Sequence, residues 1–307
     1  MTNTAPFATP PARRGVRLAF LALLAGALSI AFAPIFVRLS EVGPTATAFW
    51  RPALAVPALW LWLGVERRGT SAPRRPSGWA DVAALGLAGA LFAGDLFFWH
   101  WSVRFTSVAN STLFANFAPI FVTLASWALF RERFTATFLA ALALAIAGAV
   151  VLMGDSLTID TDHLFGDALG IVTAMFYGAY IITVGRLRAR FSTATIMTWS
   201  AIVTTVCLLP ATWVIGEALI PATLYGWAVL LGLALFSHAG GQSLIAYALA
   251  HLPAAFSSLS LLLQPVAAAV LAWLILGEPL GPLQALGGAI VLAAIALAHG
   301  GMPRVGA

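Results

Sequence analysis

The sequence predicts an all-α polytopic membrane protein, with ten transmembrane helices in an inverted five-plus-five repeat and both termini in the cytoplasm. Three observations lead to this fold class. The chain is 61% hydrophobic and only 9% charged, whereas a soluble globular protein carries about 25% charged residues. Apolar runs long enough to cross a bilayer follow one another along most of the chain. A stretch in the first half also recurs in the second half.

The expected spans are separated by short segments that carry Pro, Gly or charged residues. A helix needs about 20 apolar residues to cross the hydrocarbon core. The expected spans are 17–38, 44–64, 80–103, 107–130, 134–153, 164–186, 193–215, 222–249, 254–276 and 281–300. The first follows Arg13, Arg14 and Arg17 and resembles a signal peptide, with 31–33 similar to a cleavage site. Because many spans follow, we interpret it as a retained first helix.

The arginines predict the orientation. With the N-terminus inside, the cytoplasmic side receives Arg13, Arg14, Arg17, Arg67, Arg68, Arg74, Arg75, Arg131, Arg133, Arg186, Arg188, Arg190 and Arg304. The other side receives Arg38 and Arg104, together with Glu41, Asp155, Asp160, Asp162, Asp167, Glu217 and Glu278. This excess of basic residues on one side follows the positive-inside rule and supports the count of ten.

The internal repeat joins 109–132 to 255–278 at a constant offset. The aligned pairs are Pro119 with Pro265, Trp127 with Trp273, Glu132 with Glu278, Gly94 with Gly240 and Trp101 with Tyr247. Each half has five spans, an odd number, so the second half must run upside down relative to the first. Such a pseudo-two-fold places a central site near the midplane of the membrane.

The repeated stretches resemble the EamA family of the drug/metabolite transporter superfamily. The resemblance is carried by 97–118 leading into Pro119 and Glu132, by 244–263 leading into Pro265 and Glu278, and by the aromatic–Arg pair in 49–51. It covers essentially all ten spans and is close to bacterial amino-acid exporters, including exporters of aromatic amino acids. The pattern departs from strict repetition where Arg131 of the first half becomes Gly277 in the second.

The resemblance implies a multi-pass transporter of small organic solutes in the bacterial inner membrane. The expected organisation is a disordered cytoplasmic N-terminus (1–16), a first EamA-like repeat (17–153), a periplasmic linker (154–163), a second repeat (164–300) and a cytoplasmic tail (301–307). The expected function is export of amino acids, aromatic ones among them, by alternating access around a central cavity. The alternatives are a multidrug or organic-cation exporter and, from another class, an intramembrane enzyme.

Arg51 and Asp95 are the clearest charges inside the expected spans. Counting helical rise from the outer helix ends places them at similar depth on helices adjacent in sequence. We therefore expect them to form an ion pair, because an unpaired charge at the helix centre costs about 2.5–3.5 kcal/mol on insertion scales. They could face the substrate cavity, where Arg51 would meet a carboxylate or Asp95 an ammonium group. Alternatively they only clamp two helices, or Arg51 snorkels outward.

Aromatic and polar residues supply the other cavity candidates. Phe97, Phe98 and Trp101 end the third span, and Trp101 aligns with Tyr247 of the second half. They could bind an aromatic or cationic solute or belong to the interfacial aromatic belt. The remaining candidates are His238 and Gln242, followed by the weaker Tyr177, Tyr180, Trp199, Ser257, Ser258, Ser260 and Gln264.

His238 and the two repeated prolines have both functional and structural interpretations. His238 lies beside Gly240 and Gly241, which allow local unwinding; it could relay a proton or form a neutral hydrogen bond with a neighbouring helix. Pro119 and Pro265 should each kink a span and could act as hinges, although packing alone could require them.

Several kinds of chemistry lack their sequence motifs. There is no phosphate-binding loop with a lysine, no catalytic triad motif and no Cys/His metal cluster, and Cys207 is the single cysteine. We therefore expect no enzymatic activity, no cofactor and no metal, and transport without ATP hydrolysis. The expected partners are a small-molecule substrate and the lipid bilayer, without nucleic acid, with the chain as a monomer or homodimer.

Overall fold

The computed structural model describes residues 13–69, 74–106, 108–154 and 161–300. Most of the expected N-terminal segment, most of the linker and the C-terminal tail lie outside these ranges. The described residues contain helices and turns and no strand.

The helices follow the expected spans closely. They are α1 (Arg13–Ala31), α2 (Ala33–Leu39), α3 (Pro44–Ala53), α4 (Ala55–Glu66), α5 (Trp79–Phe105), α6 (Val108–Ala115), α7 (Ala118–Phe130), α8 (Ala136–Met153), α9 (Leu164–Leu187), α10 (Thr193–Ile215), α11 (Leu224–Gly232), α12 (Ser243–Ala248), α13 (Ala254–Ser260), α14 (Leu263–Leu276) and α15 (Pro282–Gly300). A 3₁₀ turn, η2 (Thr161–His163), precedes α9, and a π-helical segment, η3 (Leu233–Gln242), joins α11 to α12.

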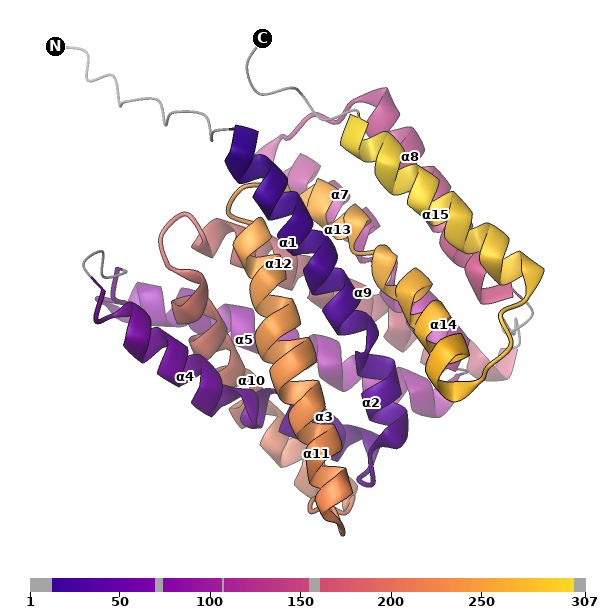
Figure 1. Ribbon diagram of the computed structural model, residues 1–307. Coiled ribbons are helices and arrows are strands. Elements are labelled where there is room, and N and C mark those ends of the chain that lie inside the picture. Colours follow the sequence, from indigo (N-terminus) through magenta and orange to yellow (C-terminus); the bar gives the residue numbers. More distant parts are fainter. Residues whose placement is uncertain (1–12, 70–73, 107, 155–160, 301–307) are drawn as a thin grey trace, which may run out of the picture.

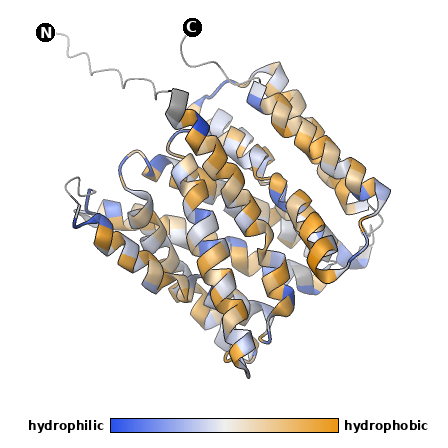
Figure 2. Cartoon of the chain, in the orientation of Figure 1, coloured by the Kyte–Doolittle hydropathy of each residue, from blue (hydrophilic) through white to orange (hydrophobic). Residues whose placement is uncertain are grey.

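These elements form ten helical segments that are long and apolar enough to cross a membrane, counted over the described residues. The predicted fold class is thereby confirmed. The location of both termini in the cytoplasm stays a prediction. The segment α1 begins and α15 ends at the upper side of the view in Figure 1, as an even number of spans requires. Figure 2 shows hydrophobic residues along most of the length of the helices.

Several spans are interrupted near prolines. α6 ends and α7 begins on either side of Asn116 and Phe117, next to Pro119. α13 and α14 are separated at Leu261 and Leu262, next to Pro265. Proline lacks an amide proton and its ring clashes with the preceding turn, so a helix is readily interrupted there. The predicted kinks are therefore present, and their use as hinges stays a prediction.

The two halves pack against each other with equivalent helices in contact. α8 lies along α15, and α10 lies against α3 and α4, so each of these contacts joins a span to its repeat mate. α5 packs on α9, and the equivalent contact in the repeat is that of η3 and α12 with α1. The α8–α15 contact depends on Gly148 and Gly287, because a Cβ atom at Gly287 would overlap the backbone of Leu152. The small residues of the fifth and tenth spans therefore serve a contact within the chain.

At one end of the bundle, which we call the outer end, each half caps a helix of the other. Glu217 accepts hydrogen bonds from the backbone N–H groups of Thr45 (2.8 Å) and Ala46 (3.0 Å) at the start of α3. Glu41 accepts one from the N–H of Thr223 (3.0 Å) and another from its hydroxyl, at the start of α11. The first N–H groups of a helix have no partner inside it, and its N-terminus favours negative charge. Both carboxylates therefore stabilise helix ends while joining the two halves.

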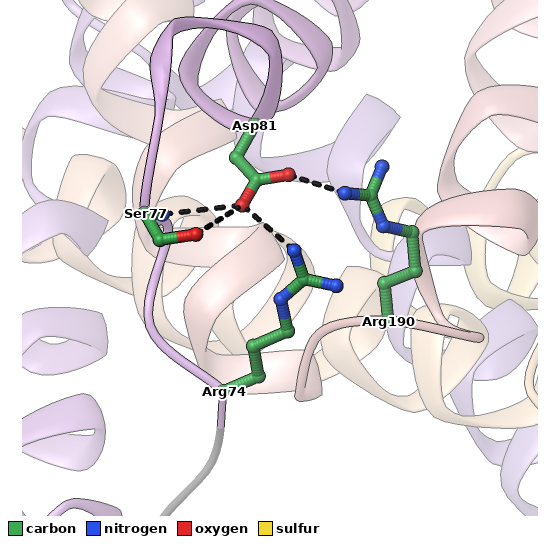
Figure 3. Close-up of polar contacts among 4 residues, drawn as sticks. All are labelled: Arg74, Ser77, Asp81 and Arg190. Carbon is green, nitrogen blue, oxygen red and sulfur yellow. Dashed lines mark hydrogen bonds and ion pairs between the residues drawn. The ribbon is translucent and has the colours of Figure 1, made fainter.

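At the opposite, inner end, Asp81 joins the halves through arginines. Figure 3 shows Asp81 between Arg74 and Arg190, with Ser77 beside it. Its Oδ2 atom accepts from the Ser77 N–H (3.1 Å) and from Arg74 (3.1 Å), and its Oδ1 atom accepts from Arg190. Because Arg190 follows α9 and Asp81 begins α5, this cluster links the second half to the first.

We predict that Gly287→Leu lowers the thermal stability of the purified protein in detergent. Overpacking of this kind costs about 1–3 kcal/mol. The matched control is Gly64→Leu, because a Cβ atom at Gly64 meets nothing within 4 Å. Equal melting temperatures for the two variants would show that α8 and α15 do not pack through Gly287.

The Glu41 cap predicts a pH dependence of stability. Its hydrogen bonds with Thr223 lower the pKa of Glu41 below its usual 4.5. Since the folded-state pKa is lowered, the stabilisation is complete above about 4.5 and is lost as the pH falls through the lowered value. Melting temperatures measured across acidic pH should fall less steeply in Glu41→Gln and in Thr223→Val than in wild type. A slope unchanged in both variants would contradict this role.

Candidate substrate site

A cavity of about 170 Å³ lies between the two halves and receives residues from both. Its wall includes parts of α2, α5, α6, α9 and α14. The charged and amide side chains on this wall are Arg51, Asp95, Asn116, Gln242 and Gln264.

The stripe that α5 presents to the cavity consists of Phe92, Asp95, Leu96 and Trp99. The spacing i, i+3, i+4 and i+7 places all four residues on one face of a helix. Asp95 therefore lies between two aromatic rings on the cavity wall.

Arg51 reaches the cavity from the last turn of α3. The guanidinium lies over the ring of Phe92, with 5.7 Å between its Cζ atom and the ring centroid. Its Nε atom is buried and has no hydrogen-bond partner among the described residues.

Arg51 and Asp95 share the cavity without forming the direct ion pair expected from the sequence. Their charges attract each other electrostatically, yet no ion pair within 4.0 Å joins Arg51 to a carboxylate in the described ranges. Both charged groups therefore face a shared space, and a ligand that carries both signs of charge could contact both.

The amide groups on the wall lie at irregular points of their helices. Asn116 lies at the break between α6 and α7, Gln264 lies just after the break between α13 and α14, and Gln242 ends the π-helical segment η3. The Nε2 atom of Gln264 is buried and lacks a partner among the described residues. π-helical segments within α-helices are frequent at functional sites.

Of the ten cavity candidates from the sequence, four line this cavity: Arg51, Asp95, Tyr177 and Gln242. The proposed hinge residue Pro265 also lines it, and Pro119 is buried at the start of α7.

The other aromatic candidates on α5 pack among themselves and on neighbouring rings. The Phe97 ring contacts the rings of Phe98 (5.4 Å between centroids) and Trp101 (5.5 Å). Phe98 stacks on Phe176 of α9 at 5.3 Å. These rings are absent from the wall of the described cavity, and a contact with substrate stays a prediction for them.

Three further candidates lie away from the cavity wall. His238 is fully buried and contacts the ring of Phe92 at 5.4 Å, so it stands behind the cavity lining. Both of its ring nitrogens lack a partner among the described residues. Tyr247 contacts His251 at 5.2 Å, and Trp199 packs against the hydrophobic core.

Three residues that line the cavity are not among the candidates from the sequence: Trp99, Asn116 and Thr112. A signal for Trp99 was present, because it follows Asp95 by four residues and therefore shares its helical face. Asn116 and Thr112 lie on one short helical stretch before Pro119, and nothing in their composition separates them from their small polar neighbours.

The cavity lies toward the outer end of the bundle. The inner halves of two repeat mates meet, since α13 packs against α7. Their outer halves, α6 and α14, both contribute residues to the cavity wall. The cavity therefore lies on the outer side of the layer in which α7 and α13 pack together.

Ten spans arranged as two related halves, around a central cavity that carries a few charged and amide side chains, define a membrane transporter. The family model of the EamA-like transporter family matches residues 15–154 and 164–299. These two matches cover both halves and most of the sequence. The chain belongs to this family, and family membership indicates a transporter rather than an enzyme.

Characterised and uncharacterised relatives are similar over nearly the whole chain. The pseudopaline exporter CntI of Pseudomonas aeruginosa is 26% identical over 94% of this chain and 96% of its own length. A probable terminal-alkyne amino-acid exporter of Streptantibioticus cattleyicolor is 30% identical over 87% of this chain and 88% of its own. An uncharacterized transporter of Archaeoglobus fulgidus is 27% identical over 86% and 91%.

A solved crystal structure has the same fold. It superposes with a TM-score of 0.75 and 18% sequence identity, covering 94% of this chain and 97% of the other. This likeness shows the fold alone.

Proposed function

We propose that this protein exports small zwitterionic metabolites, foremost amino acids and aromatic ones among them, by alternating access without ATP hydrolysis. The observation that carries the proposal is the placement of Arg51 and Asp95 on one cavity wall without a direct ion pair between them. An amino acid carries a carboxylate and an ammonium group on adjacent atoms, and each finds its counter-charge here.

The carboxylate would bind Arg51 and the ammonium group would bind Asp95. Arginine suits a carboxylate because its planar group offers several donors in fixed geometry. The unpartnered Nε atom of Arg51 and the Nε2 atom of Gln264 supply donors for the same anion. A buried charge is costly unless it is paired, so a zwitterion that neutralises both residues would bind better than a solute that meets one.

The size of the cavity favours a small solute. Sites for drug-sized molecules measure about 300–1,000 Å³, whereas this cavity has about 170 Å³. The side chain of the substrate would lie against Phe92 and Trp99, whose rings can stack on an aromatic group.

The relatives support the same substrate class. One is a probable terminal-alkyne amino-acid exporter and another is a pseudopaline exporter. Export rather than import is proposed here by analogy with these proteins, and the inner membrane by analogy with bacterial members of the family.

The second candidate function is export of organic cations. It is favoured by Asp95 and Trp99, since an amine could combine an ion pair with a cation–π contact. In that case Arg51 would repel the solute, which makes Arg51 the residue that discriminates between the two functions.

Uptake into liposomes that contain the purified protein tests the proposal. Three probes separate the charges: phenylalanine, phenethylamine (which lacks the carboxylate) and 3-phenylpropionate (which lacks the amine). We expect saturable uptake of phenylalanine above both analogues. Arg51→Gln should lower kcat/KM for phenylalanine by about 10- to 150-fold, the range for a hydrogen bond to a charged group. The same variant should not lower kcat/KM for phenethylamine, which has no carboxylate to bind Arg51. Asp95→Asn should also lower kcat/KM for phenylalanine. It should not lower kcat/KM for 3-phenylpropionate, which has no ammonium group to bind Asp95.

The matched control is Arg104→Gln, because Arg104 is exposed at the end of α5 and does not line the cavity. It should transport phenylalanine like wild type. Uptake of phenethylamine above phenylalanine, with no loss in Arg51→Gln, would select the organic-cation function. Absence of saturable uptake for every amino acid would contradict the proposal.

A second prediction separates two tryptophans two positions apart on α5. Trp99 lines the cavity, whereas Trp101 packs on Phe97 and Phe105. Trp99→Ala should therefore raise KM for aromatic amino acids by about two- to twelvefold, the size of one aromatic pair, and more than Trp101→Ala does. A larger effect of Trp101→Ala would place the aromatic subsite on the other face of α5.

A further inference from the structure

An ion pair joins the two halves at the outer end, beside the cavity. Arg38 near the end of α2 pairs with Glu278, which follows α14. Both side chains are partly exposed, at 54% and 43% of their surface. Val37 and Ala268, on the same two helices, line the cavity. The ion pair therefore holds together two helices that form part of the cavity wall.

The repeat gives each partner a mate in the other half. Glu278 corresponds to Glu132, as the aligned prolines and tryptophans require. Arg38 corresponds to Arg186, because AFAPIFVRL at 31–39 aligns with AYIITVGRL at 179–187. The same offset superimposes the Thr-Ala-Thr run at 45–47 on the one at 193–195.

The two glutamates follow the same helix-ending turn. Arg131 and Gly277, which precede them, both have left-handed backbone conformations, with φ of 55° and 68°. The N–H of Glu132 donates to the Ser126 carbonyl oxygen (3.2 Å), and that of Glu278 donates to the Ala272 carbonyl oxygen (3.4 Å). The backbone therefore presents the two carboxylates in equivalent ways at opposite ends of the bundle.

At the inner end, the corresponding residues Arg186 and Glu132 are not paired. Among the described residues, neither Arg186 nor Glu132 forms an ion pair. The Arg186 guanidinium lies over the ring of Phe130 instead, with 3.3 Å between Cζ and the ring centroid. A groove of about 780 Å³ is lined by residues of α5, α7 and α9, and Phe130 and Arg186 lie on its wall. At the inner end, α7 and α9 thus pack against each other without the charge pair that joins their mates α14 and α2 at the outer end.

We propose that Arg38–Glu278 and Arg186–Glu132 are two alternating ion pairs that report and set the side to which the cavity opens. The proposal rests on alternating access. Because the halves have related folds and opposite orientations, opening the cavity to the inner side should place each half in the conformation now adopted by its mate. Glu132 then pairs with Arg186, and Arg38 leaves Glu278. Exposed ion pairs are weak, which lets either be exchanged for the other during each cycle.

The test is the rate at which a cavity cysteine reacts with a bulky maleimide in the purified protein. Ala115→Cys serves as the reporter, because Ala115 lines the cavity from α6, which carries none of the four charges. The background is Cys207→Ala, which removes the exposed native cysteine. Glu278→Gln should slow labelling and Glu132→Gln should not. The labelling rate in Glu132→Gln should exceed that in Glu278→Gln by about two- to fivefold, the effect of one exposed ion pair.

Matched variants distinguish the loss of an ion pair from a general loss of folding. Arg38→Gln should behave like Glu278→Gln, and Arg186→Gln like Glu132→Gln. The charge exchange of Arg38→Glu with Glu278→Arg should restore the rate of the reporter background. Equal rates in Glu132→Gln and Glu278→Gln, or failure of the exchange to restore labelling, would overturn the proposal. Labelling requires no substrate, so the proposal can fail while amino-acid uptake succeeds, and the reverse also holds.

Discussion

In the hydrocarbon core no water is present to satisfy a backbone amide, so a helix can be irregular only where protein or a cavity meets its free groups. The irregular spans of this chain contribute cavity residues close to their irregularities. Pro34 follows the break between α1 and α2, Arg51 precedes that between α3 and α4, and Asn116 lies between α6 and α7. Gln242 ends the π-helical segment, and Gln264 follows the break before α14. Five irregular spans therefore supply much of the cavity wall, while the uninterrupted helix α5 supplies Asp95.

Most of the fold could be predicted from the sequence because the bilayer imposes a length and a composition on each span. The ten expected spans agree with the structure to within a few residues, and the interruptions occur next to Pro119 and Pro265 as their chemistry requires. The break between α3 and α4, beside Pro52 and Leu54, was not predicted, although proline inside a span was visible. A proline within a span does not by itself predict an interruption, because Pro210 lies inside the uninterrupted helix α10.

The site was predictable only in part, because a helix in lipid is apolar on all sides. Its sequence therefore gives little indication of which face is turned toward the cavity. The charge of Asp95 identifies it as a candidate in the sequence. The aromatic candidates Phe97, Phe98 and Trp101 were chosen without information on which face of α5 is turned toward the cavity. The structure turns Phe92 and Trp99 toward the cavity and leaves Trp101 on another face. Arg51 and Asp95 both line the cavity, while the absence of a direct ion pair between them depends on tertiary packing that neither helix encodes alone.

The reciprocal caps at the outer end have a consequence for the order in which the chain becomes structured during synthesis. The N-terminus of α3 receives its carboxylate from Glu217, and that of α11 receives its carboxylate from Glu41. The ribosome therefore completes α3 long before the residue that caps it has been made, whereas α11 meets a carboxylate already in the membrane. A chain that ends before Glu217 would lack the carboxylate that caps the start of its second span. Each half of the internal repeat thus supplies a helix cap to the other.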